Sequence, residues 1–446
     1  MLNCHFGFTG TKVVEMFLEI QTRRDGTKKS DKILINVKKQ AISVSINTFT
    51  VFTFDLRGRL ITAVSNGHTF RRSLDNRIME KWSMTKNSHH LRTRLWLKSE
   101  NRHVLIDQIH ERIRNIYSLL KNDRFEILTM SMDDLHTVKP EVLNALEKIL
   151  YFDFNRLEKD ARTFSAIYPH VGILPPDMYL AILLQATQGC SYNQCNYCYF
   201  YKDQPYRIKS EREFSQHIQA VKKYFGEAML LRKYLFLGEA NALDIYQSVL
   251  LNFLDAINQQ FYFSDTQVKS ATKSTVPVLA GIYSFLTAFH KNQKSADDFA
   301  ELKAKNLRKV YIGMETGSDE LLHFLNKPGK TANVVGIVND IKQAGVHVGI
   351  IILLGAGGRK YYQSHTNETI LAVNEMNLGN GDTIFFSPIK QLLHTHYEFK
   401  LAKEKIAALS PEEMENQRRA MTEGFNFPNG VQSPKIAIYD INEFIY

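Results

Sequence analysis

The chain has 446 residues and a mass of 51.4 kDa, so two or three domains of ordinary size fit within it. Hydrophobic residues make up 44% and charged residues 23%, which is typical of a globular protein and excludes a disordered or collagen-like chain. The longest strongly apolar run, 348–354, is much shorter than the roughly 20 residues that cross a bilayer, so no membrane partner is expected. The first residues lack a positive segment followed by an apolar one, which predicts no secretory signal and a cytoplasmic location.

The positive charge is concentrated in the first third of the chain. The formal net charge is +10, and residues 1–150 hold 25 lysines and arginines against 16 aspartates and glutamates, which accounts for nine of the ten charges. A basic region of this kind suits an anionic partner, such as RNA or a phosphorylated substrate. A solvated basic surface without a partner is the alternative interpretation.

Short β-branched runs predict strands early in the chain, at 33–37, 42–46 and 51–54. The segment 55–61 is typical of a hairpin turn that enters another strand. Apolar residues three and four positions apart then predict an amphipathic helix at 103–121, and 134–150 repeats the pattern. The first part of the chain is therefore expected to mix strands and helices.

After the prolines at 175 and 176, apolar runs alternate with helical patterns. The apolar runs are 179–186, 234–237, 278–285, 309–314, 346–353 and 383–387. The amphipathic stretches between and after them are 211–224, 242–259, 296–307, 334–344 and 368–376. Six apolar strands that alternate with helices predict a parallel sheet covered by helices, either open or curled into a partial barrel. Functional residues are then expected on the loops at the carboxyl ends of the strands.

These patterns predict four parts in chain order. They are an α+β domain at 1–130, a helical connector at 131–174, an α/β barrel at 175–400 and a tail at 401–446. In the tail, Ser410-Pro-Glu-Glu is typical of a helix start, with a capping serine and a proline in the first turn. The rest of the tail is expected to be irregular.

Three of the four cysteines, Cys190, Cys195 and Cys198, lie within nine residues, directly after the first predicted barrel strand. A secreted protein of this size would spread its cysteines in distant pairs, whereas clustered thiols indicate soft-metal ligation in a reducing compartment. Three thiolates on one loop can hold three corners of a cubic iron–sulfur cluster and leave its fourth iron open. Structural zinc would need a fourth ligand, either Cys4 or a distant histidine, and a redox disulfide or free thiols are a further alternative.

The loop from Gln185 to Phe200 resembles the cluster motif of the radical S-adenosylmethionine (radical SAM) superfamily. The usual spacing there is C-x3-C-x2-C with an aromatic residue before the third cysteine, here Tyr197, and this sequence has one extra residue in the first gap. The resemblance implies that the three cysteines ligate a [4Fe–4S] cluster and that SAM chelates the open iron, with Tyr197 among the cofactor-binding residues. It also implies a partial (β/α)6 barrel, which agrees with the six alternations found independently.

Three further segments resemble SAM-binding elements of the same family, in the expected order along 175–390. Gly238 and Glu239 follow the second strand and resemble a Gly-Gly-Glu element that binds the SAM amino group. Glu315 and Thr316 follow the fourth strand and resemble a segment that hydrogen-bonds the ribose, for which a carboxylate is suited because it accepts from two hydroxyls. Gly355 follows the fifth strand in a glycine-rich turn that resembles the adenine-binding one.

The resemblance implies that a flavodoxin- or ferredoxin-type donor reduces the cluster. SAM is then cleaved to methionine and a 5′-deoxyadenosyl radical, which abstracts hydrogen from the substrate. Because only Cys4 is left over, subclasses with auxiliary clusters or paired catalytic cysteines are excluded, and no segment matches an added cobalamin domain. The strand ends are most similar to the subgroup of oxygen-independent coproporphyrinogen oxidase, but the substrate does not follow from that likeness. Segment 201–209 offers cations that suit an anionic substrate, and a loop that anchors the first helix is the equal alternative.

Two other functions fit the sequence. One is an RNA-binding protein with a structural metal at the cysteine loop, which the basic N-terminal excess favours. The other is a catalytically silent barrel in which the cluster and SAM act as a sensor.

Overall fold

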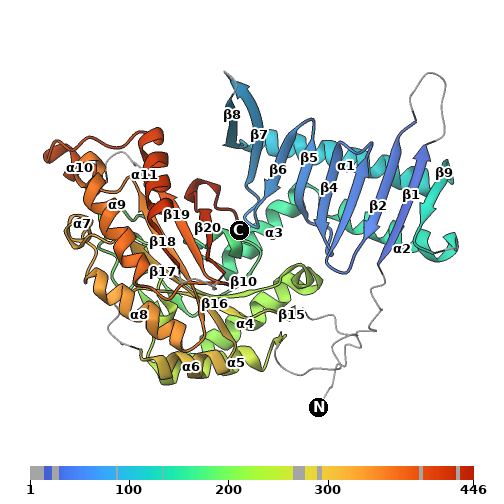
Figure 1. Ribbon diagram of the computed structural model, residues 1–446. Coiled ribbons are helices and arrows are strands. Elements are labelled where there is room, and N and C mark those ends of the chain that lie inside the picture. The colour runs from blue at the N-terminus through green and yellow to red at the C-terminus, as the bar shows by residue number, and fades with distance from the viewer. Residues whose placement is uncertain are drawn as a thin grey trace, which may run out of the picture.

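The computed structural model describes residues 15–22, 30–86, 89–132, 134–264, 277–288, 294–390, 395–427 and 432–446. Within these ranges the chain forms a nine-stranded antiparallel sheet in its N-terminal half and a seven-stranded parallel sheet in its C-terminal half (Figure 1). No helix of the described part is long and apolar enough to cross a membrane. Cys4, a possible fourth metal ligand, lies outside the described residues.

The N-terminal sheet has the strand order β8-β7-β6-β5-β4-β3-β2-β1-β9. Its strands are β1 (Met16–Thr22), β2 (Lys32–Val37), β3 (Ala41–Ile46), β4 (Thr50–Asp55), β5 (Leu60–Ser65), β6 (His68–Arg72), β7 (Ile78–Lys86), β8 (His89–Trp96) and β9 (Phe125–Met130). Alternate residues of the central strands are buried, as Ile33 and Ile35 in β2 are, so one face of the sheet packs against protein. The strands predicted at 33–37, 42–46 and 51–54 are confirmed as β2, β3 and β4.

Helices cover the buried face of this sheet. They are α1 (Ser99–Lys121), α2 (Leu135–Tyr151) and α3 (Phe154–Ile167). In α1 the buried residues Ile109, Ile113 and Ile116 recur every three or four positions, which is the stripe that predicted the helix at 103–121. Residues of α2 and the first turn of α3 belong to the same core as the strands, so much of the predicted connector 131–174 packs within the N-terminal half.

The parallel sheet has the order β10-β13-β16-β17-β18-β19-β20. Its strands are β10 (Ile182–Gln185), β13 (Leu235–Gly238), β16 (Ile282–Leu286), β17 (Leu307–Glu315), β18 (His347–Leu354), β19 (Thr383–Pro388) and β20 (Lys435–Ile438), with two-residue pairs β11 (Thr187–Gln188) with β12 (Arg207–Ile208) and β14 (Tyr262–Phe263) with β15 (Val278–Leu279). The first six strands are buried almost throughout, which is why they appear as continuous apolar runs in the sequence.

Helices follow these strands and cover the outside of the curved sheet (Figure 1). They are α4 (Glu211–Phe225), α5 (Gln247–Asn258), α6 (Ala296–Ala304), α7 (Asp319–Phe324), α8 (Thr331–Gln343), α9 (Gly358–Asn374), α10 (His396–Lys403) and α11 (Pro411–Gly424), with 3₁₀ turns η1 (Pro176–Met178), η2 (Gly226–Leu231), η3 (Ala242–Asp244) and η5 (Ile441–Glu443). The α/β class and the strand–helix alternation predicted after residue 176 are thus confirmed.

The tail differs from the prediction. Its helix α11 starts as expected, with Ser410 as cap and Pro411 in the first turn. The end of the tail, however, is not irregular, because β20 pairs in parallel with β19 as a seventh strand of the sheet. This strand has only four residues and is half-exposed, so the sequence shows no strand pattern there. It is ordered by hydrogen bonds to the open edge of β19.

A buried charge network joins the two halves of the molecule. Arg59, in the turn after β4, is 1% exposed and lies 2.7 Å from Asp55 and 3.3 Å from Asp160 of α3. The hydroxyl of Tyr224 in α4 donates to the same Asp160 carboxylate at 2.9 Å. A single arginine therefore links the N-terminal sheet, through α3, to the first helix of the barrel.

The C-terminal segment also joins the halves and fixes the first barrel strand. The Tyr446 hydroxyl accepts from the Leu183 amide of β10 and donates to the Ala181 carbonyl. The Tyr446 carbonyl in turn accepts from the amide of Leu74, which belongs to the N-terminal half. The strand that precedes the cysteine loop is thereby fixed from both halves of the chain.

Candidate functional site

The cysteine loop follows β10 at the carboxyl end of the parallel sheet. It begins at Gly189, whose φ is 70° and whose Cα faces the Gln204 carbonyl oxygen so closely that a Cβ would lie 2.6 Å from that oxygen. This turn therefore requires glycine. The paired strands β11 and β12 bring the two ends of the loop together. The loop thus extends from a fixed base over the carboxyl ends of the strands.

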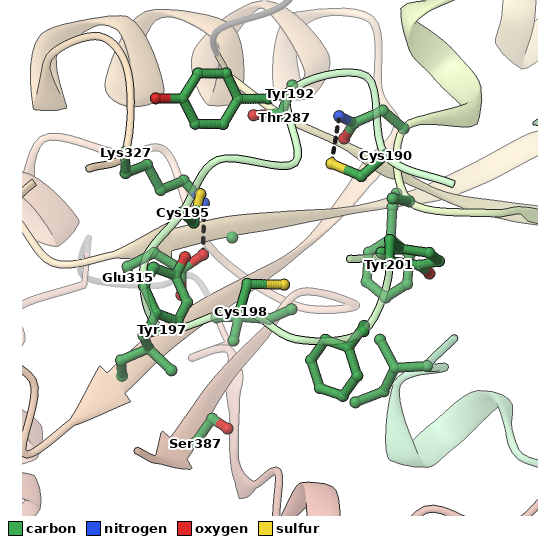
Figure 2. Close-up of a pocket in the computed structure, with 18 of the residues that line it drawn as sticks. Cys190, Tyr192, Cys195, Tyr197, Cys198, Tyr201, Thr287, Glu315, Lys327 and Ser387 are labelled. Atoms are coloured by element: carbon green, nitrogen blue, oxygen red, sulfur yellow. Dashed lines mark hydrogen bonds and ion pairs between the residues drawn. The ribbon is translucent and has the colours of Figure 1, made fainter. Parts of the chain in front are cut away.

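The side chains of Cys190, Cys195 and Cys198 line one cavity of ≈ 270 Å³. All three are free, partly buried thiols, and Figure 2 shows them on one stretch of loop around a common space. Among the described residues, no three His, Cys, Asp or Glu side chains converge closely enough to hold a single metal ion. A zinc ion needs all its sulfur ligands about 2.3 Å away, whereas a cluster takes each thiolate on a different iron. Three thiols on one loop can each ligate a different iron of a cluster.

Burial raises the pKa of two of the thiols, Cys195 and Cys198. It raises the pKa of Cys198 to about 12. It also raises the pKa of Cys195, although the nearby Lys327 ammonium acts in the opposite direction. Because metals bind the thiolate, loading of the site must displace protons from these two residues at neutral pH.

A buried ion pair stands beside the cysteines. Glu315 ends β17 with a φ of 67°, and its Oε1 lies 2.5 Å from the Nζ of Lys327 in the same cavity (Figure 2). Burial lowers the pKa of Lys327, but the Glu315 charge outweighs it and the pKa is raised. Burial, together with the nearby Glu315 charge, raises the pKa of Tyr197 well above its usual value. Two of the predicted SAM contacts, Tyr197 and Glu315, are therefore brought together with the cysteines.

Glu239 is placed elsewhere. Its side chain does not line the cavity and lies buried beneath the base of the cysteine loop. There Oε1 accepts from the Gln185 side chain at 2.7 Å and Oε2 accepts from the Gly189 amide at 3.0 Å. Burial raises the pKa of Glu239 to about 7, against these hydrogen bonds. Gly238 does not line the cavity either, and its carbonyl accepts from the Ala186 amide. Both residues support the loop.

Thr316 and Gly355 also lie behind the cavity wall. Thr316 is fully buried, and its hydroxyl accepts from the Ser318 amide at the start of α7. The amide of Gly355 donates to the Gln417 side chain of α11, and a Cβ at this glycine would meet the Met414 sulfur at 2.8 Å. Thr316 and Gly355 therefore shape the turns after β17 and β18, and neither lines the cavity that holds the cysteines.

Several cavity residues were not identified from the sequence. Asn241 and Asp244 follow β13, and the Asn241 amide donates to Ser191 of the cysteine loop at 3.0 Å. Lys327 follows α7, where no motif singles it out. Tyr439 follows β20, in the part of the tail predicted to be irregular, so no pattern placed it at the site.

Comparison with known proteins assigns this site to a family. Residues 184–361, which include the cysteine loop, the Glu315–Lys327 pair and Gly355, match the model of the radical SAM superfamily. The comparison with curated proteins gave no match.

Among solved structures, three similar chains are radical SAM or related enzymes. Coproporphyrinogen III oxidase (HemN) from Escherichia coli has 13% identity and a TM-score of 0.37, over 59% of this chain and 56% of that one. The methyltransferase TsrM from Kitasatospora setae has 13% identity and a TM-score of 0.36, over 50% of this chain and 37% of that one. Methylornithine synthase (PylB) has 15% identity and a TM-score of 0.35, over 66% of this chain and 81% of that one.

These likenesses are too distant to bear on substrate or reaction, and the chain spans only about a third of the length of TsrM and about half that of HemN. The family assignment rests on the matched residues themselves. Residues 184–361 therefore form a radical SAM domain, of a superfamily whose enzymes use SAM and an iron–sulfur cluster.

Proposed function

We propose that the protein cleaves SAM reductively at a [4Fe–4S] cluster held by Cys190, Cys195 and Cys198, and abstracts hydrogen from a substrate bound above the barrel. The observation that carries the proposal is the placement of three free thiols from one loop around one cavity. Three thiolates leave one corner of a four-iron cluster without a protein ligand, which is the position that SAM requires.

The Glu315–Lys327 pair would hold the polar parts of SAM. Lys327 is a buried ammonium in the cavity, so it is suited to the SAM carboxylate, and Glu315 is suited to the ribose hydroxyls. Because the two side chains already neutralise each other, neither charge is buried alone before SAM binds. Tyr197 lines the same cavity and would contact bound SAM from the loop side.

The remaining cavity residues would exclude water and bind the substrate. Apolar walls come from Phe285 of β16 and from Ile351 and Leu353 of β18. When bound, the cluster and SAM supply the radical chemistry, and these walls keep solvent from the reacting atoms. Lys390 also lines the cavity and is exposed, so it favours a substrate with an anionic group.

We further propose a flavodoxin- or ferredoxin-type protein as the source of the electron. The cysteine loop lies at the carboxyl ends of the strands, and its residues Ser191 and Gln194 are exposed, so a donor can approach the thiol ligands from outside the barrel. The basic excess of residues 1–150 is not needed by this function, and RNA binding is not part of the proposal.

The test compares the parent protein with Cys195→Ser after anaerobic reconstitution with iron and sulfide. We expect about four irons per chain and a [4Fe–4S] EPR signal on reduction, and the spectrum should change when SAM is added. Cys195→Ser should lose the signal, and the matched control Cys4→Ser, outside the loop, should keep it. Zinc in place of iron, or equal iron in both cysteine variants, would refute the proposal.

A further inference from the structure

Lys202 is tied to the backbone of the cysteine loop. This residue is exposed and lies four positions after Cys198. Its ammonium nevertheless forms hydrogen bonds to the protein. Its Nζ donates to the Asn193 carbonyl at 2.8 Å and to the Cys195 carbonyl at 3.0 Å. Asn193 lies in the gap between the first two cysteines, Cys190 and Cys195, and Cys195 ends that gap. A positive charge is therefore fixed directly on the loop that carries the thiols.

The same contact explains how the loop accommodates its longer first gap. Asn193, inside that gap, has a φ of 49°, a left-handed conformation that asparagine tolerates better than most residues. Its amide donates to the Cys190 sulfur at 3.4 Å, and its side chain donates to the Tyr201 carbonyl at 2.7 Å. The Asn193 carbonyl then faces Lys202. The extra residue is thus taken up in a turn that Lys202 closes.

The other anchors of the loop are neutral. The Asn326 side chain, after α7, donates to the Gln194 carbonyl at 2.8 Å, and its own carbonyl accepts from the Tyr192 hydroxyl at 2.9 Å. The Asn196 side chain donates to the Phe324 carbonyl at 2.7 Å. Among the described residues no carboxylate forms an ion pair with Lys202. Lys202 therefore adds to the loop a charge that these neutral contacts do not.

We propose that Lys202 is a positioning residue with a second role: it shapes the first cysteine gap and its charge stabilises the reduced state of the cluster. The inference rests on the proposed function. One electron passes from the flavodoxin- or ferredoxin-type donor, or from dithionite in the assay, to the cluster, which becomes more negative by one charge. A fixed cation nearby lowers the free energy of the more negative state. Because Lys202 is exposed, salt weakens this effect.

The experiment is an EPR-monitored redox titration of reconstituted parent protein and four variants. Lys202→Met removes charge and donors, Lys202→Gln removes charge but keeps a donor, and Lys202→Arg keeps both. Lys223→Met, an exposed lysine at the end of α4 and so at the opposite end of the barrel, is the matched control. At a fixed potential, Met and Gln should lower the ratio of reduced to oxidised cluster about tenfold, which corresponds to about 59 mV for one electron. Arg and the control should match the parent.

The salt dependence supplies a readout that a purely structural role would not move. The difference in midpoint potential between the Lys202→Gln and Lys202→Arg variants should become smaller as the ionic strength is raised. Equal midpoint potentials in all variants, or an Arg variant that shifts as far as Met, would overturn the inference. If Lys202→Met fails to assemble a cluster, the comparison of Gln with Arg still decides it. A parent protein without a four-iron cluster would instead refute the proposed function.

Discussion

The Glu315 carboxylate and the Lys327 ammonium meet inside the cysteine cavity, with Oε1 and Nζ 2.5 Å apart and both side chains about nine-tenths buried. Neither charge has a substitute partner of opposite sign among the described salt bridges. The pair therefore has two consequences that can be measured separately, one for stability and one for SAM binding.

Lys327→Met should destabilise the fold by about 3–5 kcal/mol, because it leaves the Glu315 charge buried without its partner. The double variant Glu315→Gln/Lys327→Met should recover most of that loss, since no unpaired charge remains. Both should bind SAM at least about tenfold more weakly, which corresponds to about 1.4 kcal/mol. Urea unfolding and equilibrium dialysis with SAM measure the two effects. Full SAM binding by the double variant would exclude the pair as a SAM contact.

The raised pKa of Lys327 sets the pH range of this stabilisation. The contribution is fully present below the ordinary lysine pKa and is lost only as pH rises through the still higher folded value. The contribution of the Glu315–Lys327 pair to the free energy of unfolding should therefore stay constant between about pH 6 and pH 9.

Glu239 should make the metal-free chain less stable as pH rises from about 4.5 to 7. Burial raises its folded pKa to about 7, so in this range the folded state holds a proton that the unfolded state has lost. The decrease in the free energy of unfolding approaches about 3 kcal/mol and then levels off above pH 7. Glu239→Gln should flatten the slope. Urea unfolding at several pH values tests this, and an unchanged slope in the variant would show that another group causes it.

Cys198 should react slowly with iodoacetamide in the metal-free protein. With a pKa of about 12, its thiolate fraction at pH 8 is small and should rise about tenfold for each pH unit. Peptide mapping by mass spectrometry after timed alkylation gives the rate, with glutathione as the reference thiol. Iron loading should protect the residue at every pH. A rate equal to that of glutathione at pH 8 would contradict the burial of this thiol.

Arg59→Met should separate the two halves of the molecule energetically. It leaves the buried Asp55 and Asp160 carboxylates without their shared partner, which should cost about 3–5 kcal/mol. The matched control is Arg77→Met, whose exposed pair with Asp75 should cost less than about 1 kcal/mol. Thermal unfolding and limited proteolysis at the junction measure the difference. Equal melting temperatures for both variants would show that Arg59 does not join the halves.

The sequence predicted the parallel sheet because its first six strands are buried on both sides and therefore carry continuous apolar runs, such as 346–353. The helices were predicted from single buried stripes, as in α1. β20 was missed because four half-exposed residues gain their order from β19 and not from their own pattern. An element that is buried carries a hydrophobic pattern that can be recognised in the sequence. An exposed strand that is ordered by pairing with a neighbour carries no such pattern.

The site divides in the same way. The cysteines and Glu315 were singled out because each belongs to a short motif at the end of a predicted strand, and all four line one cavity. Glu239 was expected to face SAM, but a motif does not specify which way a side chain points, and here the loop amide of Gly189 binds it. Lys327, after α7, and Tyr439, after β20, are brought to the cavity by the fold alone. Long-range packing places such residues, and no local spacing encodes them.

The most direct test of the account is the formation of 5′-deoxyadenosine. Reconstituted protein is incubated anaerobically with dithionite and SAM, and the products are separated by chromatography. The account predicts 5′-deoxyadenosine and methionine from the parent protein, and none from Cys190→Ser, Cys195→Ser or Cys198→Ser. Intact SAM with a fully assembled four-iron cluster would contradict it, and would leave a protein that binds the cofactors without using them for catalysis.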